Sequence, residues 1–302
     1  MSPIAILIVL ASATVHAGWN LLGKRARPAP AYFALASLTG AVLLSPLFLL
    51  WRDTLPLIPG SVWLSLLVTG AFQAVYMTGL AAAYRTGDLS LAYPVARALP
   101  VLLVPLVTGV LRIGEPISPL GGVGMVIVVI GLLLVVHRSI ATIRLASFIS
   151  PAVAWALIAG IGTTGYSIID NGAVELFRAG LDTGPGDLRA PLIYILLESA
   201  STATWLLTMT LLVRGPQRVR ADFVALDKRL TMLAGTGIVV AYGLVLVAFG
   251  FAENVSYVVA FRQVSLPIGT LFGVVFLGER VGVPRLVGTL LIVTGLVLVA
   301  TG

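Results

Sequence analysis

Two arginines within long apolar stretches are the residues of this sequence best placed to do chemistry. Arg97 lies in the run LAYPVARALPVLLVPL, and Arg262 lies in VSYVVAFRQVSLPIGTLF. A guanidinium at membrane depth costs about 2.5–3.5 kcal/mol on insertion scales unless it faces a polar cavity or a partner. Because the planar fork of arginine suits a carboxylate or a phosphate, the pair predicts a cationic site for an anionic group. The alternative is that each guanidinium reaches the membrane interface or bonds a helix carbonyl.

A second polar group lies near the start of the chain, in VHAGWNLL. His16 and Asn20 are four residues apart and share one helical face, with Trp19 beside them. Because a free histidine side chain has a pKa near neutrality, His16 could bind a solute or exchange a proton. A hydrogen bond to another helix, worth about 0.6 kcal/mol on average in membranes, explains it equally well. Lys24 is interpreted as a topology anchor.

Glu198 is the acid that lies furthest inside an apolar run, in LLESASTATW. A buried carboxyl can load and release a proton, which makes Glu198 the candidate for proton coupling. Its alternatives are a pairing with an arginine or a helix that begins later. Asp170 stands at the end of the preceding run and is interpreted as an acid of the interfacial loop. Glu115 and Glu279 directly follow apolar runs and are interpreted as turn residues.

Other polar or amphipathic side chains interrupt the apolar runs. A buried tyrosine often needs only one hydrogen-bond partner, so each such residue is either a cavity contact or a structural group. The candidates are Gln73, Tyr76, Tyr93, Tyr166, Tyr242, Tyr257 and Gln263. Prolines in the same runs as the two arginines can kink a helix or free carbonyls beside a cavity: Pro94, Pro100, Pro105 and Pro267.

The apolar runs themselves predict an all-α integral membrane protein. The 302 residues are 59% hydrophobic and 10% charged, whereas soluble domains contain about 25% charged residues. A span needs about 20 apolar residues, and continuously apolar runs lack the alternating pattern of a membrane β-barrel. The runs that qualify as ten transmembrane helices are 4–22, 31–50, 61–83, 89–111, 119–136, 150–169, 188–213, 230–251, 255–277 and 286–300.

The two halves of the sequence, 1–145 and 146–302, resemble each other. The segment that begins GDLSLAYPVAR parallels the segment that begins AENVSYVVAFR, at an offset of about 165 residues, which pairs Arg97 with Arg262. The same alignment pairs Glu115 with Glu279. Because each half holds five expected spans, the second half must cross the membrane upside down, as in the inverted repeats of many transporters.

Charged loops predict the orientation of the chain. Most loop arginines and lysines follow odd-numbered helices, whereas the segment 170–187 is net acidic. Under the positive-inside rule the basic loops are cytoplasmic, which places both termini outside.

Composition also excludes several kinds of site. The sequence has no cysteine and two histidines, so we expect neither a metal site nor a cofactor. The net charge of +7 sits in short clusters between apolar runs, where it sets topology rather than binding nucleic acid. The expected partners are a small-molecule substrate and the lipid bilayer, with monomer and homodimer both open. The preference for arginine over lysine suits a GC-rich bacterial genome, so we expect a bacterial inner (plasma) membrane.

Ten spans in two halves, each with a Gly-Glu pair before a Gly-rich apolar helix, resemble the drug/metabolite transporter superfamily, and most closely its EamA type. IGEPISPLGGVGMVIVVIGLLLV and LGERVGVPRLVGTLLIVTGLVLV carry this resemblance, together with GDLS, YPVAR and HAGWNLLGK. The resemblance implies that helices 1 to 4 and 6 to 9 surround a central cavity, with helices 5 and 10 outside. It also implies cytoplasmic termini, which disagrees with the loop charges.

These observations favour a secondary transporter that moves a small metabolite, of the amino acid, sugar or organic anion class, by alternating access and with proton coupling as an option. The sequence has no nucleotide-binding motif of the GxxxxGK[ST] kind, so ATP is not its energy source. An intramembrane enzyme, a channel and a structural membrane partner are the alternatives. We do not expect an enzyme, because Glu198 lacks an apparent catalytic partner in the sequence.

Overall fold

The computed structural model describes residues 1–23, 29–86, 89–135, 149–277 and 282–302. Within these ranges the chain is all-helical, without a strand. The first half contains α1 (Pro3–Gly23), α2 (Pro30–Leu44), α3 (Pro46–Leu50), η1 (Arg52–Leu57), α4 (Gly60–Thr86), α5 (Leu89–Leu111) and α6 (Pro119–Leu134). The second half contains α7 (Pro151–Gly180), α8 (Arg189–Arg214), α9 (Pro216–Val224), α10 (Lys228–Phe249), α11 (Val255–Phe261), η4 (Arg262–Val264), α12 (Ser265–Leu277) and α13 (Val283–Thr301).

Nine segments of the described residues are long and apolar enough to cross a membrane, and each lies at a position predicted for a span. The run predicted over 119–136 is present as α6, a shorter apolar helix of 16 residues. The expected boundary between the halves, at 145 and 146, lies outside the described residues, as do Lys24 and Glu279. Many large apolar side chains are exposed on the outer faces of the helices. The chain is an integral membrane protein, because such a surface needs lipid around it.

Proline and short polar caps explain where several helices begin. Proline occupies the first turn of α2, α6, α7 and α13, where its missing N–H costs nothing. The Ser118 hydroxyl accepts from the Gly121 N–H at the start of α6, and the Ser150 hydroxyl accepts from the Val153 N–H at the start of α7. These bonds satisfy N–H groups that have no partner within the helix.

Two predicted helices differ from the observed ones. The run predicted to end at 169 continues as α7 to Gly180, because Asp170 is fully buried within the bundle and does not end the helix. The run predicted over 255–277 is divided by the 3₁₀ segment η4, so that α11 ends at Phe261 and α12 begins at Ser265.

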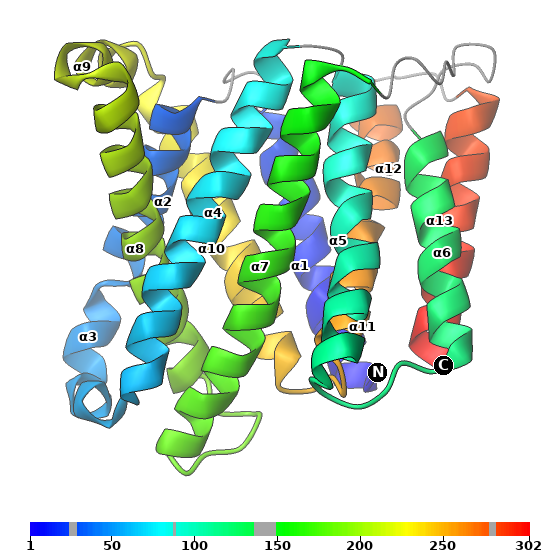
Figure 1. The fold of residues 1–302 in the computed structure, drawn as a ribbon, viewed down its shortest axis with the longest axis horizontal. Helices are drawn as coiled ribbons and strands as arrows, with labels where there is room; N and C mark the ends of the chain where they lie inside the picture. The colour runs from blue at the N-terminus through cyan, green and yellow to red at the C-terminus, as the bar shows by residue number, and fades with distance from the viewer. Residues whose placement is uncertain (24–28, 87–88, 136–148, 278–281) are drawn as a thin grey trace.

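The helices pack in a few dominant pairs (Figure 1). α4 lies along α7, α1 lies along α10, and α2 lies against α8. α6 and α13 lie side by side at the right of the view, and both termini lie at the end of the bundle opposite α9.

The contact between α6 and α13 is built on glycine. A Cβ atom on Gly124 would lie 2.6 Å from the carbonyl oxygen of Gly295, and one on Gly131 would lie 2.7 Å from that of Gly288. The two backbones therefore touch directly, as small residues allow between membrane helices.

Candidate functional site

A cavity with about 820 Å³ of empty space lies at the centre of the bundle. Its walls come from α1, α2, α4, α5, α7, α8, α10 and η4, and the described residues of α6 and α13 take no part in it. This is the arrangement that the family resemblance implied. The cavity brings together the following sequence candidates: His16, Trp19, Gln73, Tyr76, Arg97, Tyr166, Glu198 and Arg262.

Arg97 crosses from α5 to the interrupted helix of the second half. Its guanidinium donates to the Ser265 hydroxyl at 2.6 Å and to the backbone carbonyl of Arg262 at 3.3 Å. A third contact, of 3.3 Å, joins the guanidinium to His16 Nε2. The buried Nε of Arg97 has no hydrogen-bond partner among the described residues. Arg97 thus makes the helix-carbonyl bond foreseen as an alternative and still presents a charged group to the cavity.

Arg262 belongs to η4 and lies over an aromatic ring. Its guanidinium carbon is 5.2 Å from the centre of the Tyr242 ring, within the range of a cation–π interaction. Tyr242 packs edge-on against Tyr166 at 5.4 Å, and Tyr166 packs against Tyr76 at 5.9 Å. A row of three tyrosines therefore holds one side of the cationic end of the cavity.

Buried acids occupy a second part of the cavity region. Asp170 is fully buried rather than an acid of the interfacial loop, so that interpretation is wrong. Its carboxyl accepts from the hydroxyls of Thr69, Tyr194 and Tyr242, at 2.5, 2.8 and 2.5 Å. Glu198 is 1% exposed and accepts from the Gln73 amide. The i, i+4 spacing of Tyr166 and Asp170 on one helical face was a signal that could have identified Asp170.

The α1 candidates take different positions. The His16 and Trp19 rings meet edge-on at 5.0 Å on the cavity wall. Trp19 also packs closely against α10, since a Cβ atom on Gly237 would lie 2.7 Å from the Trp19 Cβ. The Asn20 amide donates to the His16 carbonyl of its own helix at 3.0 Å and is not among the residues that form the cavity wall.

Three further candidates lie elsewhere. Tyr93 and Gln263 help to form a smaller cavity, with about 420 Å³ of empty space, beside the first. Four residues line both cavities: Tyr76, Arg97, Tyr166 and Arg262. Tyr257 accepts a hydrogen bond from the Ser118 N–H at 2.9 Å and thereby fixes the start of α6. Among the described contacts, that structural role is the one Tyr257 has.

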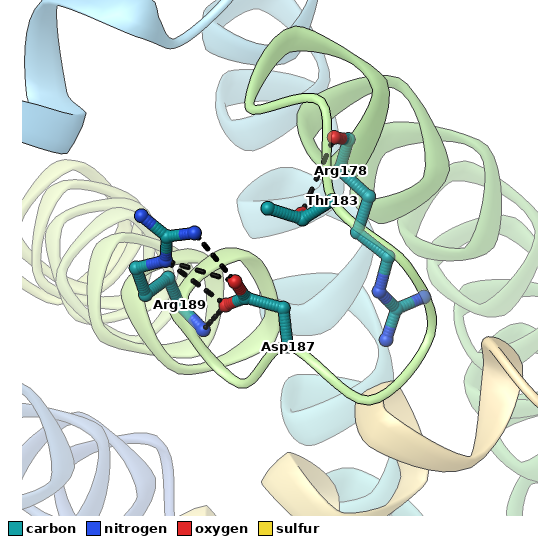
Figure 2. Close-up of polar contacts among 4 residues, drawn as sticks. All are labelled: Arg178, Thr183, Asp187 and Arg189. Carbon is teal, nitrogen blue, oxygen red and sulfur yellow. Dashed lines mark hydrogen bonds and ion pairs between the residues drawn. The ribbon is translucent and has the colours of Figure 1, made fainter.

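The connection between α7 and α8 holds a separate charged group (Figure 2). Arg189 forms an ion pair of 2.6 Å with Asp187, and its backbone N–H also donates to that carboxyl. The hydrogen bonds from Arg189 hold the pKa of the Asp187 carboxyl below its usual range. Arg178 turns away from this pair (Figure 2) and donates to the Leu246 carbonyl of α10 at 3.4 Å.

Comparisons with known proteins also point to a membrane transporter fold. A solved structure described as "Crystal structure of protein" superposes with a TM-score of 0.70 and 17% identity, over 99% of this chain and 96% of that chain. No curated protein matches the sequence. Residues 3–137 match the model of the EamA-like transporter family. The match covers the first of the two halves of the chain, which is therefore similar to the EamA-like transporter family of the drug/metabolite transporter superfamily, and the fold is shared with the solved structure over nearly the whole chain.

Proposed function

We propose that the chain is a secondary transporter that moves a small metabolite with an anionic group across a bacterial inner (plasma) membrane by alternating access. The observation that carries the proposal is the placement of Arg97 and Arg262 in one central cavity. Two guanidinium groups at membrane depth attract a carboxylate or a phosphate.

The helix contacts support two inverted repeats of five spans. In the repeat, α1 corresponds to α7, α2 to α8, α4 to α10 and α6 to α13. When corresponding helices are exchanged, the α4–α7 pair becomes the α10–α1 pair, and the α4–α8 pair becomes the α10–α2 pair. The α2–α8 and α6–α13 pairs map onto themselves. An inverted repeat of this kind lets the halves exchange conformations, so that the cavity opens to alternate sides.

In this proposal the substrate is bound by charged and by aromatic side chains of the cavity. Arg97 and Arg262 hold the anionic group, while Trp19 and the tyrosine row pack against the remainder of the solute. His16, in contact with Arg97, orients that guanidinium. Glu198 also lines the cavity and is proposed as the proton-coupling residue.

Flux into proteoliposomes tests the proposal. The purified chain is reconstituted and offered labelled succinate, glucose 6-phosphate, alanine and glucose. We expect saturable uptake and counterflow of at least one anionic probe, above that of neutral glucose. Flux that does not saturate would identify a channel, and chemical conversion of a probe would identify an enzyme. Neither outcome fits a transporter, and preference for glucose would contradict the anionic site.

A further inference from the structure

The carboxyl groups of Asp170 and Glu198 adjoin inside the bundle, although they come from different helices. Residues one helical turn apart on α4 and on α8 link the two acids. On α4, Thr69 bonds Asp170 and Gln73, four residues later, bonds Glu198. On α8, Tyr194 bonds Asp170 and stands four residues before Glu198 itself. Residues four apart lie one turn apart on one face, so these contacts make the two carboxyls neighbours.

The hydrogen bonds of the two acids are unequal. Asp170 accepts from three hydroxyls that come from three helices, an environment that favours a carboxylate. Glu198 accepts from the Gln73 amide through Oε1 alone, and its buried Oε2 has no hydrogen-bond partner among the described residues. Two ionised carboxyls are both acceptors. A hydrogen bond between Oε2 and the Asp170 carboxyl therefore forms only when a proton lies between them.

We infer that Asp170 and Glu198 form one proton-binding site, in which Glu198 Oε2 carries the proton and donates it to the Asp170 carboxylate. The pair then holds a single negative charge, and the unpartnered oxygen of Glu198 is satisfied. On release, the O–H bond of Glu198 breaks, the electron pair stays on Oε2, and the proton passes to water in the cavity that Glu198 lines.

The site is connected to the cationic end of the cavity by Tyr242. The Tyr242 hydroxyl donates to Asp170, and Arg262 lies over the ring of the same side chain. Loss of the proton adds a negative charge beside Arg262, which competes with an anionic solute for that guanidinium. The ionisable groups that face the pair or line the same cavity are Tyr76 of α4, Tyr166 of α7, Tyr194 of α8, Tyr242 of α10, Arg262 of η4, Arg97 of α5 and His16 of α1.

Infrared spectroscopy of the intact chain in liposomes tests the site without any substrate. We expect a protonated carboxylic acid band at neutral pH that disappears at alkaline pH. The band should be absent from Glu198→Gln and present in Asp170→Asn. Glu175→Gln is the matched control, since Glu175 is an exposed acid on the same helix as Asp170; it should leave the band unchanged.

Several results would overturn the assignment. A band that survives in Glu198→Gln would place the proton elsewhere. A band that vanishes in Asp170→Asn would do the same. A band that responds to Na⁺ at constant pH would indicate a metal cation instead. The pH titration of the unaltered chain needs no variant. It can therefore contradict the inference even if a variant fails to fold.

The consequence for transport rests on the proposed function and has its own measurement. With labelled succinate as probe, uptake driven by a pH gradient is divided by counterflow for each chain. Glu198→Gln should lower this ratio below that of the unaltered chain. An unchanged ratio would show that the proton site does not drive transport. Absence of any counterflow in the unaltered chain would instead contradict the transporter proposal, and the infrared result would stand by itself.

Discussion

The Arg97 guanidinium donates to the backbone carbonyl of Arg262 at 3.3 Å, and the two residues stand 165 positions apart in the chain. This separation equals the offset at which the halves of the sequence align, so the paired arginines of the alignment are also in contact. They are not used alike. Arg97 bonds across to the other half, whereas Arg262 lies over Tyr242 within its own half.

The unequal contacts predict unequal variants. Arg97→Gln should lower both anionic uptake and stability, because it removes charged hydrogen bonds that contribute about 1.5–3 kcal/mol each. Arg262→Gln should lower uptake with a smaller loss of stability, since a cation–π contact contributes about 0.5–2 kcal/mol. Flux into proteoliposomes and thermal unfolding in detergent measure the two effects. Lysine at either position should restore uptake only in part, because an ammonium lacks the bidentate fork. Unchanged uptake in both Gln variants would contradict the proposal that the two arginines bind the anionic group.

Glycine at the α6–α13 contact predicts a sharp difference within one helix. Gly131→Ala would bring a methyl group within 2.7 Å of the Gly288 carbonyl oxygen, and such overpacking costs about 1–3 kcal/mol. Gly122→Ala in the same helix is the control, because a Cβ atom there meets nothing within 4 Å of the described residues. Thermal unfolding in detergent compares them. Equal melting temperatures would show that the helices separate easily.

Loop charge and family resemblance disagree on orientation, and a reporter fused after Gly302 decides between them. The positive-inside rule predicts that the reporter is outside the cell. Activity of a reporter that works only in the cytoplasm would show that the family orientation holds despite the loop charges. A second fusion within α9, at the end of the bundle opposite the termini, must give the reverse result.

The Asp187–Arg189 pair predicts a pH dependence of stability. Because the pKa of Asp187 is lowered in the folded chain, the pair stabilises the fold above the unfolded pKa of about 3.9. This stabilisation is lost as the pH falls through the lower, folded value. Arg189 is substantially exposed, so the effect is small. Asp187→Asn should therefore melt earlier than the unaltered chain at pH 7 and converge with it in acid.

Asp182→Asn is the control for this pH dependence, since Asp182 is an exposed acid of the same loop. Its melting temperature should follow that of the unaltered chain at every pH. A difference between Asp187→Asn and the unaltered chain that persists at the acid limit would show that the contribution of Asp187 is not ionic.

The sequence was sufficient for the helices because apolar length is a local property. It was also sufficient to pair Arg97 with Arg262, since both lie in recognisable copies of one segment. Asp170 was misplaced for a different reason. A carboxyl looks like the end of a span, and the hydroxyls that accommodate it come from Thr69, Tyr194 and Tyr242 on three other helices. No neighbouring residue reveals those partners.

The interruption of the ninth expected helix shows the same limit. Pro267 suggested a disturbance, yet the 3₁₀ turn lies at Arg262–Val264. Its position coincides with the carbonyl of Arg262 that Arg97 bonds from the other half. That carbonyl accepts from the Ser265 N–H of the turn as well as from Arg97. A donor more than a hundred residues away is invisible to local patterns. Asn20 differs from Asp170, since its amide donates to a carbonyl of its own helix.

The glycine contact between α6 and α13 has a mechanical consequence. Backbones that already touch at Gly124 and Gly131 cannot move closer, and separation would open a gap along two glycine-lined grooves. The buried side chains of Val128 and Ile292 also pack against these glycines. If the cavity opens to alternate sides as proposed, α6 and α13 should therefore move together as one closely packed pair. The displacements that open the cavity should then fall on the other helices.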